Sequence, residues 1–373
     1  MILWLALIIW VCCCSLKMKL QPKPSRLSLQ TTPLPNWQQA IIVMAPIIFF
    51  IGLRSGGADT PAYINSYLNY ETGLSSIFSE DTWQNSEWLF RIFGKTVKTF
   101  ISSDFHIYLF MIALITGLSL CRGFHLYSDY FFDSVALFII TGTFTWMING
   151  IRQFLVVAIL FANFRLLVER KWWYYIPLII VLSRVHQSAI LMLPVYFVVQ
   201  GEPWNKKTLG ILLGSIVLIF FSAYALKLMD DALAFVHYTK YEGKNALLAE
   251  RDDGSSPIHT LIMAVPPVLA WIKAKEIRKL HSTTVNIMIN MSILACAFSL
   301  LANVTTGIFA GRIPIYFTIY NLLLLPFLIR KVYPRNIGQP LYFGMYAAYL
   351  FLFFYLYLGT YYYVSDWLHL YLP

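Results

Sequence analysis

The chain has 373 residues, of which 58% are hydrophobic and only 12% are charged, whereas an ordinary soluble domain has about 25% charged residues. This composition excludes a soluble globular protein and indicates a membrane protein. The formal net charge is +10, but the basic residues are scattered between apolar runs and form no basic domain. We therefore expect no nucleic-acid partner.

Ten apolar stretches are long enough to span a bilayer, which takes about 20 residues or somewhat fewer where helix ends are drawn inward. They cover residues 1–16, 38–53, 105–121, 132–148, 151–168, 208–226, 258–272, 285–304, 313–329 and 341–363. The first lacks a basic start and a small-residue cleavage site, so we expect it to be retained. The pattern predicts an all-α, polytopic integral membrane protein with a single transmembrane domain over residues 1–373.

The five cysteines all lie within or beside apolar stretches, at Cys12, Cys13, Cys14, Cys121 and Cys296. None forms a CxxC pair or a polar framework in which a disulfide or a zinc site is built. The sequence therefore implies no structural metal, disulfide or cofactor.

Lys and Arg cluster beside the spans, and short cytoplasmic loops retain such positive charge. The clusters follow the first, fifth, seventh and ninth spans and precede the sixth. All can be cytoplasmic only if the N-terminus lies outside and residues 172–199 begin and end on the cytoplasmic side. We therefore predict that 172–199 is a hairpin of two short helices. The alternative is one tilted helix of 28 residues with a polar centre, which would reverse the orientation on one side of it.

The hairpin prediction has independent support, because a polar group interrupts the apolar run between Pro177 and Pro194. Its members are Ser183, Arg184, His186, Gln187 and Ser188. Broken backbone at membrane depth is tolerated only where protein or water surrounds it. We expect this hairpin tip to lie near the outer face and to line a cavity.

Two hydrophilic loops, 54–104 and 228–257, face outward on this map. In the first, Thr60 is expected to cap a short helix that has Pro61 at its first position and carries Asp59, Tyr63 and Tyr67 at about four-residue spacing. Residues 88–100 alternate apolar and basic side chains at helical spacing, which predicts an interfacial helix with Arg91, Lys95 and Lys98 on its polar side. The second loop is predicted to be a solvated lid or a plain connection.

Four arginines abut spans on the outer side: Arg54, Arg152, Arg184 and Arg312. An arginine at membrane depth costs about 2.5–3.5 kcal/mol on insertion scales, so four on one face favour a shared anionic ligand. The guanidinium fork matches phosphate oxygens bidentately, which points to a diphosphate. The plain alternative is that each arginine reaches lipid phosphates or pairs with a local carboxylate.

Other polar residues stand beside these arginines. Asn149, Arg152 and Gln153 share one face at a helix start, and Tyr316 lies one helical turn after Arg312. His186 suits proton transfer near neutral pH, although a histidine held by a backbone carbonyl is at least as common. Asp59 is either a base or, more often in such positions, the structural partner of Arg54.

Four segments resemble the EpsG family of bacterial membrane proteins, which is similar to the Wzy-type polysaccharide polymerases. They are RSGGADTPAY at 54–63, NGIRQ at 149–153, HQSA at 186–189 and GRIPIY at 311–316. The resemblance extends over about residues 40–330. It implies a fold like that of lipid-dependent (GT-C-like) glycosyltransferases in the bacterial cytoplasmic membrane, with the active site facing outward.

The resemblance further implies an enzyme that polymerises undecaprenyl-diphosphate-linked oligosaccharide repeat units for O-antigen, capsule or exopolysaccharide, without a metal. We assign Arg152, Arg184 and Arg312 to the diphosphates, Arg54 and Asp59 to orienting sugar or phosphate, and His186 to the base. Tyr63 and Tyr316 would stack on sugar rings, with Asn149 and Gln153 contributing to substrate binding. The partners implied are the lipid-linked substrate, membrane lipids and a chain-length regulator protein. The rival functions are a lipid-linked oligosaccharide flippase and a membrane sugar O-acyltransferase.

Overall fold

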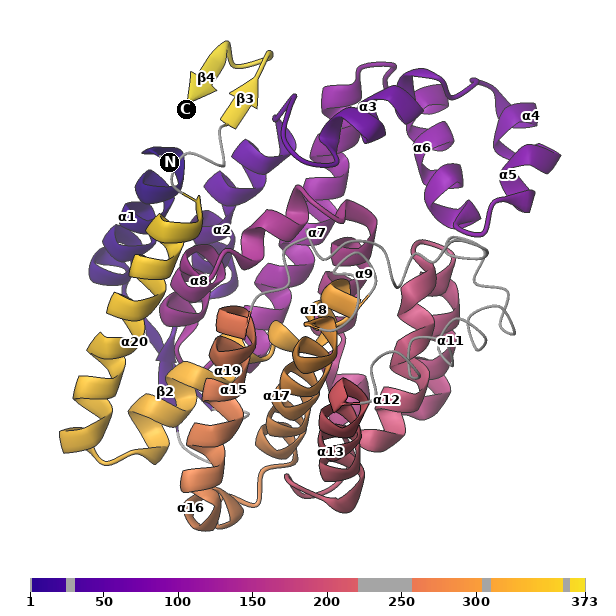
Figure 1. The fold of residues 1–373 in the computed structure, drawn as a ribbon. Coiled ribbons are helices and arrows are strands. Elements are labelled where there is room, and N and C mark those ends of the chain that lie inside the picture. Colours follow the sequence, from indigo (N-terminus) through magenta and orange to yellow (C-terminus); the bar gives the residue numbers. More distant parts are fainter. Residues whose placement is uncertain (1, 25–30, 221–256, 304–309, 358–362, 373) are drawn as a thin grey trace. The chain divides into compact units, whose positions relative to one another are not determined.

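The computed structural model describes residues 2–24, 31–220, 257–303, 310–357 and 363–372, and these are almost entirely helical (Figure 1). Four helical runs are long and apolar enough to cross a membrane: Phe105–Tyr127, Thr283–Ala302, Ile315–Val332 and Arg335–Leu356. Seven shorter apolar helices accompany them among the described residues. The predicted all-α fold of a polytopic membrane protein is confirmed.

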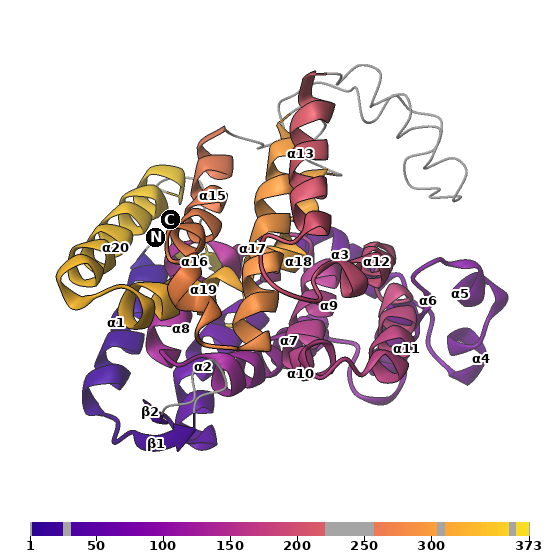
Figure 2. The same cartoon turned by 90° about the horizontal axis from the view of Figure 1, so that it is seen from below.

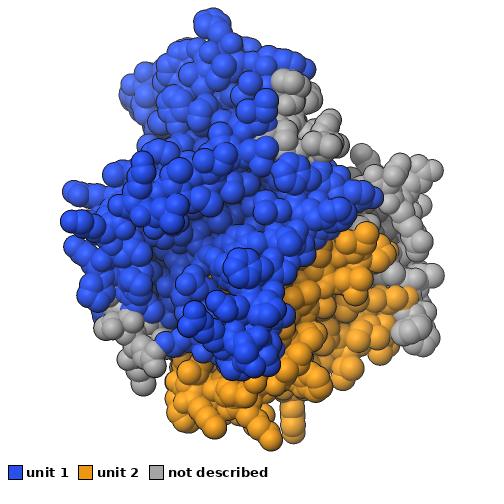
Figure 3. Space-filling view, turned by 90° about the vertical axis from the view of Figure 1, so that its left-hand side faces the viewer, with its two compact units in different colours: residues 1–194, 329–373 blue, residues 195–328 orange. Residues whose placement is uncertain are grey.

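The chain forms two compact units, coloured separately in Figure 3. Unit 1 contains Met1–Pro194 and Ile329–Pro373, and unit 2 contains Val195–Leu328. Each unit is described by itself below.

Unit 1 consists mainly of helices, long and short. Its helices are α1 (Ile2–Lys17), α2 (Trp37–Gly52), α3 (Thr60–Leu68), α4 (Leu74–Ile77), α5 (Glu80–Gln84), α6 (Trp88–Phe100), α7 (Phe105–Tyr127), α8 (Phe131–Ile140), η1 (Thr143–Met147), α9 (Ile151–Ala162), α10 (Phe164–Val168), α11 (Trp172–Ser183), η2 (Gln187–Leu191) and α20 (Arg335–Tyr357). The helix α12 (Met192–Val198) and the short π-helix η4 (Leu328–Val332) run across the boundaries of the unit. Two antiparallel ribbons complete it, β1 (Gln21–Pro24) with β2 (Thr31–Leu34) and β3 (Tyr363–Ser365) with β4 (Leu370–Leu372).

The core of unit 1 is the packing of α7 between α2 and α9, which lie side by side with it in Figures 1 and 2. A capping box starts α2, because the Asn36 side chain accepts from the Gln39 N–H at 2.9 Å and the Gln39 side chain accepts from the Asn36 N–H at 2.8 Å. On α7, Gly123 lies against the Phe161 ring of α9, where a Cβ atom would collide with the ring. Close helix packing therefore depends on that glycine.

Three predicted spans are interrupted. Residues 132–148 divide into α8 and η1 because Gly142 adopts the left-handed conformation at φ 73°. Residues 151–168 divide into α9 and α10 at Asn163, whose side chain bonds the Ile159 carbonyl. Residues 313–329 are α18 and α19 followed by a short π-helix. The last predicted span also ends earlier than expected, since residues 363–365 are a strand.

The predicted break of residues 172–199 into short helices is confirmed, whereas the cytoplasmic placement of both ends stays a prediction. Helix α11 ends at Ser183, His186 is extended at φ −151° and ψ 121°, and η2 then packs back against α11. The alternative of one continuous helix of 28 residues is wrong, because the backbone at His186 leaves the helical region altogether.

In the described part of unit 2, the other helices pack around the buried helix Thr283–Ala302. The unit contains α13 (Lys206–Phe220), α15 (Pro257–Ile272), α16 (Ala274–Arg278), α17 (Thr283–Ala302), η3 (Ala310–Arg312), α18 (Ile315–Thr318) and α19 (Asn321–Phe327). Helix α17 packs against α13, α15 and α18, and its buried Asn290 donates to the Val199 carbonyl at 2.9 Å. The predicted loop 228–257 lies outside the described residues, apart from Pro257 at its end.

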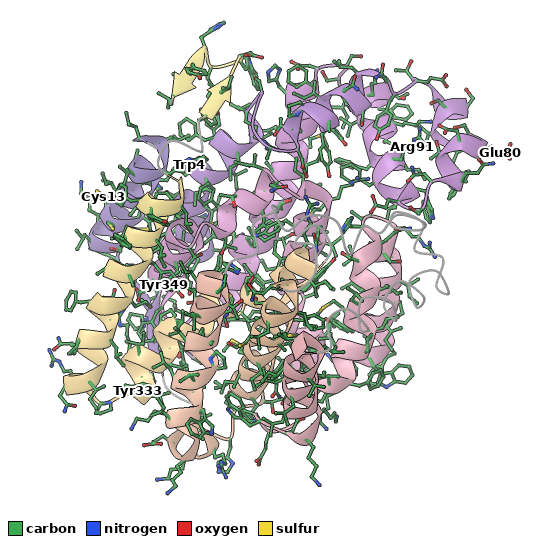
Figure 4. All side chains as sticks on the ribbon, in the orientation of Figure 1. Trp4, Cys13, Glu80, Arg91, Tyr333 and Tyr349 are labelled. Atoms are coloured by element: carbon green, nitrogen blue, oxygen red, sulfur yellow. The ribbon has the colours of Figure 1, made fainter. Side chains whose placement is uncertain are left out.

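Helix α6 was expected to expose its basic side, and it does not. Lys95 is only 3% exposed, and its ammonium donates to the Ser76 carbonyl and the Thr82 hydroxyl, each at 2.8 Å. Lys98 donates to the Leu68 and Tyr70 carbonyls. These cations satisfy the carbonyl groups of short helices that cannot satisfy their own. They thereby hold together a lobe of residues 74–100, the α4–α6 lobe, with Glu80 at its outer edge in Figure 4.

Candidate functional site

One end of unit 1 gathers polar segments that are far apart in the sequence, and we call it the polar end. It comprises the turn 54–60, the loop 85–89, the turn 149–153 and the hairpin tip 183–188. A backbone hydrogen bond of 3.0 Å from the Leu89 N–H to the Arg184 carbonyl joins the loop 85–89 to the hairpin tip, and one of 2.8 Å from the Ser55 N–H to the Val364 carbonyl joins the turn 54–60 to the strand β3. The start of α1 is also here, since Trp4 packs on Phe144 and Tyr363.

Arg54 closes the first turn and is only 2% exposed. Its Nε donates to the Thr60 hydroxyl at 2.8 Å and its Nη1 to the Ile51 carbonyl at 2.5 Å. Burial lowers the pKa of Arg54 to about 10, which leaves the guanidinium charged at neutral pH. Because its donors bind these neighbours, Arg54 shapes the turn.

Asp59 does not form the expected ion pair with Arg54. Its Oδ2 accepts a hydrogen bond of 2.7 Å from the Gly150 N–H, so the first turn is tied to the turn 149–153. Helix α3 has Asp59 at its N-cap, one residue earlier than predicted, because the Thr60 hydroxyl is taken by Arg54. Gly150 is left-handed at φ 76°, which presents its N–H to the carboxylate.

Arg152, in the first turn of α9, is surrounded by groups from the loop 54–104. It forms an ion pair with the carboxylate of Glu87, and its Nε donates to the Tyr63 hydroxyl at 3.1 Å. The guanidinium also lies 5.5 Å from the centre of the Tyr63 ring and 5.6 Å from that of Phe90, within range of cation–π attraction. Arg152 is thus fixed in position while about a third of its side chain remains exposed.

Glu87 is the centre of the site, and the sequence analysis missed it. Its Oε1 lies 2.6 Å from Nδ1 of His186 and accepts from the Gln187 N–H at 3.2 Å, while Oε2 pairs with Arg152. The side chain is 10% exposed, and burial by itself would raise the pKa of Glu87. The contacts with His186 and Arg152 outweigh this effect and hold its pKa below the usual range, so it is a carboxylate at neutral pH.

The remaining predicted residues of unit 1 differ in their surroundings. Gln153 is buried and Asn149 is half-buried, both in the turn that Asp59 holds. Arg184 is exposed, and among the described residues its guanidinium has no ion pair or hydrogen bond. Nε2 of His186 makes no hydrogen bond in the described part of the chain, and Nδ1 lies 2.6 Å from Oε1 of Glu87 in a close contact that is not aligned as a hydrogen bond.

Arg312 and Tyr316 belong to unit 2. Arg312 is the last residue of η3 and Tyr316 is buried in α18, where its N–H donates to the Ile313 carbonyl. Of the ten predicted site residues, the structure brings eight to the polar end of unit 1 and describes these two separately.

Glu87 gave no signal in the sequence because the residues that it contacts are 65 and 99 positions away. The only indication was electrostatic: several outer arginines require counter-charges, and the loop 54–104 supplies them. Among the described residues no group of three or more His, Cys, Asp or Glu side chains is arranged to hold a metal ion.

The arrangement offers two chemical functions side by side. An imidazole with a carboxylate at Nδ1 and an unpartnered Nε2 among the described residues can accept a proton from a hydroxyl group. A fixed guanidinium next to it can stabilise negative charge that develops during a reaction.

The fold and this site define a class: an all-helical, polytopic membrane protein with a polar site rich in arginine at the helix ends. The chain belongs to the EpsG family, whose model matches residues 38–369. The match includes every residue of the site described above. A search of curated proteins finds no match, and a search of solved structures finds none either. Family membership supports a general role in polysaccharide biosynthesis.

Proposed function

We propose that the protein is a polymerase that joins undecaprenyl-diphosphate-linked oligosaccharide repeat units at the outer face of the cytoplasmic membrane. The observation that carries the proposal is the cluster of His186, Glu87 and Arg152 in a member of the EpsG family. An imidazole, here proposed to act as the base, lies close to a fixed guanidinium, and this glycosyl transfer requires a base and a cation.

In the proposed reaction, a hydroxyl of the incoming repeat unit attacks C1 of the sugar at the reducing end of the growing chain. Nε2 of His186 takes the hydroxyl proton while the new bond from C1 to oxygen forms. The bond from C1 to the lipid diphosphate breaks, and the diphosphate leaves with the electron pair. Arg152, Arg184 and Arg312 are proposed to stabilise the charge that develops on the diphosphate.

The surroundings of the other residues refine their proposed roles. Arg54 and Asp59 bind groups of the protein, which favours shaping the two turns over direct contact with the substrate. The Tyr63 hydroxyl is engaged by Arg152, which favours support of that arginine over stacking on a sugar ring. Arg184, which is exposed, is the best placed in unit 1 to reach a mobile lipid diphosphate.

Two rival functions would also use a polar site in a membrane protein. A flippase for lipid-linked oligosaccharides needs basic residues at several depths of an internal path, whereas the predicted site arginines of unit 1 gather at its polar end. A sugar O-acyltransferase could use His186, but acyl transfer to a sugar would not explain the group of arginines.

Deletion of the protein in its native host tests the proposal. We expect single repeat units on the lipid carrier or cell surface and no ladder of longer chains, because export of one unit does not require joining. Loss of a flippase would trap single units facing the cytoplasm. Loss of an acyltransferase would leave chain length intact and remove an acyl group. A normal ladder in the deletion strain would refute the polymerase.

The purified protein tests the chemistry. We expect it to extend lipid-linked repeat units in the presence of a chelator, because arginines are proposed to stabilise the leaving group. Strict dependence on an added divalent cation would contradict this part of the proposal. A chain-length regulator protein is proposed as a partner, and its removal should change the length distribution without abolishing polymerisation.

A further inference from the structure

Glu87 contacts both groups to which the proposed function assigns chemistry. One oxygen faces the imidazole of His186 at 2.6 Å and the other forms the ion pair with Arg152. The two partners come from the hairpin tip and from α9, which are separated by more than 30 residues in the sequence. A single carboxylate therefore sets the distance between them.

The backbone around Glu87 is itself fixed at several points. The Asn85 side chain accepts from the Glu87 N–H at 2.9 Å, and the Glu87 carbonyl accepts from the N–H groups of Phe90 and Arg91 at the start of α6. The neighbouring Leu89 N–H is bonded to the Arg184 carbonyl, which joins the start of α6 to the hairpin tip. The carboxylate is thus held by the protein before any substrate arrives.

The chemistry of the contact determines the state of the imidazole. An ionised carboxylate has only lone pairs to offer, and at 2.6 Å it would be repelled by the lone pair of an unprotonated nitrogen, so the nitrogen that faces it must carry the proton. When His186 is neutral, its proton is therefore on Nδ1 and the lone pair is on Nε2. That is the tautomer that can remove a proton from a hydroxyl group on the side away from Glu87.

We propose that Glu87 is a positioning residue that holds His186 in the tautomer protonated at Nδ1 and holds Arg152 against Tyr63. This inference rests on the proposed function for its consequence in catalysis, but the tautomer itself can be measured without any substrate. Glu87 acts through His186 and Arg152 and need not touch the substrate.

The first test is nitrogen NMR of the full-length protein, labelled with ¹⁵N-histidine and purified in lipid nanodiscs. The signals of His186 are assigned by their absence in His186→Gln. At a pH high enough for the imidazole to be neutral, we expect a protonated Nδ1 and an unprotonated Nε2. Glu87→Gln should populate both tautomers, since an amide can donate as well as accept.

Glu80→Gln is the matched control, because Glu80 lies in the same α4–α6 lobe, is exposed and, among the described residues, accepts a hydrogen bond from the Gln84 side chain alone, at 2.8 Å. It should leave the His186 signals unchanged. A proton on Nε2 of His186 in the unaltered protein would overturn the proposal, as would an unchanged tautomer in Glu87→Gln.

The second test is the rate of chain extension with lipid-linked repeat units. We expect Glu87→Gln to slow extension about 100-fold, the order expected when a base loses its orienting group. Glu87→Asp keeps the charge, but its shorter side chain cannot span both partners, so it should restore extension only in part. In the His186→Ala background the cost of Glu87→Gln should be clearly smaller, because the histidine through which it acts is absent.

An equal cost of Glu87→Gln in both backgrounds would show that Glu87 acts independently of His186, which would overturn the proposal. The two proposals fail separately. A normal ladder in the deletion strain would refute the polymerase function and would leave the result on the tautomer valid. Loss of the ladder on deletion, together with an unchanged tautomer in Glu87→Gln, would refute the positioning role of Glu87 and would leave the polymerase function supported.

Discussion

Arg152 illustrates why charge alone does not define the role of an arginine. Its guanidinium uses Nη1 for Glu87 and Nε for the Tyr63 hydroxyl, and its flat surface lies near two aromatic rings. An ammonium group is a compact point charge with neither the planar fork nor the flat face.

We therefore expect Arg152→Lys to cripple polymerisation despite the retained charge, with a loss of at least about tenfold, corresponding to about 1.4 kcal/mol. Arg312→Lys should do the same if Arg312 binds a diphosphate. The readout is the ladder of chain lengths in a strain that carries the variant as its only copy. Full activity with lysine at both positions would exclude a diphosphate site built on arginine forks.

Arg91→Lys is the control for this substitution. Arg91 pairs with Asp81 at 2.8 Å on the surface of the α4–α6 lobe, and Figure 4 shows it there (labelled). Surface ion pairs contribute about 0–1 kcal/mol, so we expect an unchanged ladder.

A second prediction at the scale of residues concerns Gly150, whose φ of 76° is unfavourable for a residue with a Cβ atom. An added Cβ would also lie 3.2 Å from the Trp146 ring. Gly150→Ala should lower the free energy of unfolding by about 1–2 kcal/mol and weaken the Asp59 contact. Gly210→Ala in α13 is the control, since no atom lies within 4 Å of a Cβ there. Thermal unfolding checks both, and equal melting temperatures for the two variants would contradict the prediction.

At the scale of elements, the contacts of Glu87 join the α4–α6 lobe to α9 and to the hairpin tip. Arg152, His186 and the Gln187 N–H all face this carboxylate. The pKa of Glu87 lies below its usual value in the folded protein, because these contacts outweigh the effect of burial. A depressed pKa contributes stability that is present above the pKa of the unfolded chain and is lost as pH falls through the folded pKa.

We therefore expect Glu87 to stabilise the protein fully above about pH 5 and progressively less below about pH 4.3, the ordinary pKa of a glutamate. The measurement is the difference in melting temperature between the unaltered protein and Glu87→Gln at a series of pH values between about 5 and 3. The difference should shrink as the pH falls. A constant difference would mean that the carboxylate contributes nothing through its charge.

At the opposite end of unit 1, a second buried carboxylate joins two other elements. Asp133 on α8 accepts from Nη1 of Arg330 at 2.6 Å and from the hydroxyls of Tyr342 and Tyr346 on α20 at 2.7 and 2.8 Å. This cluster fastens α20 to α8 and lies beside the basic residues that the sequence map places in the cytoplasm.

At the scale of the whole molecule, unit 1 arranges its segments as the predicted topology requires. The start of α1, the loop 54–104, the turn 149–153, the hairpin tip and the strand β3 meet at the polar end. The basic cluster at Arg330 and Lys331 lies at the other end, beyond α8 and α20. The folded chain thus holds the polar segments and this basic cluster at opposite ends of unit 1. That the polar end faces outward is a prediction.

Cysteine labelling from outside, on a background without other cysteines, decides the orientation. We expect reagent to reach cysteines placed at Ser75 and Ser255 but not at Ser282 or Asn336. Ser75 lies in the exposed α4–α6 lobe, whereas Asn336 lies in the first turn of α20, at the opposite end of unit 1. Labelling at Ser282 would overturn the map and with it the shared arginine site.

The sequence alone determined the helical fold, the apolar segments, the hairpin break at residues 183–188 and the family. These follow from local patterns: the length and hydropathy of each run, the polar residues within it, and short motifs of fixed spacing. It also named Arg152 and His186, because arginine and histidine are costly within apolar surroundings and are conspicuous there.

Only the tertiary structure decided how these residues are used. It bound Asp59 to Gly150, buried Arg54 and Lys95 among hydrogen-bond acceptors, and placed Glu87 between Arg152 and His186. In the sequence, Glu87 belongs to a loop that is expected to be exposed, and a solvated glutamate is ordinary in such a loop. It becomes informative only when folding buries it against an arginine and a histidine that no local pattern connects to it.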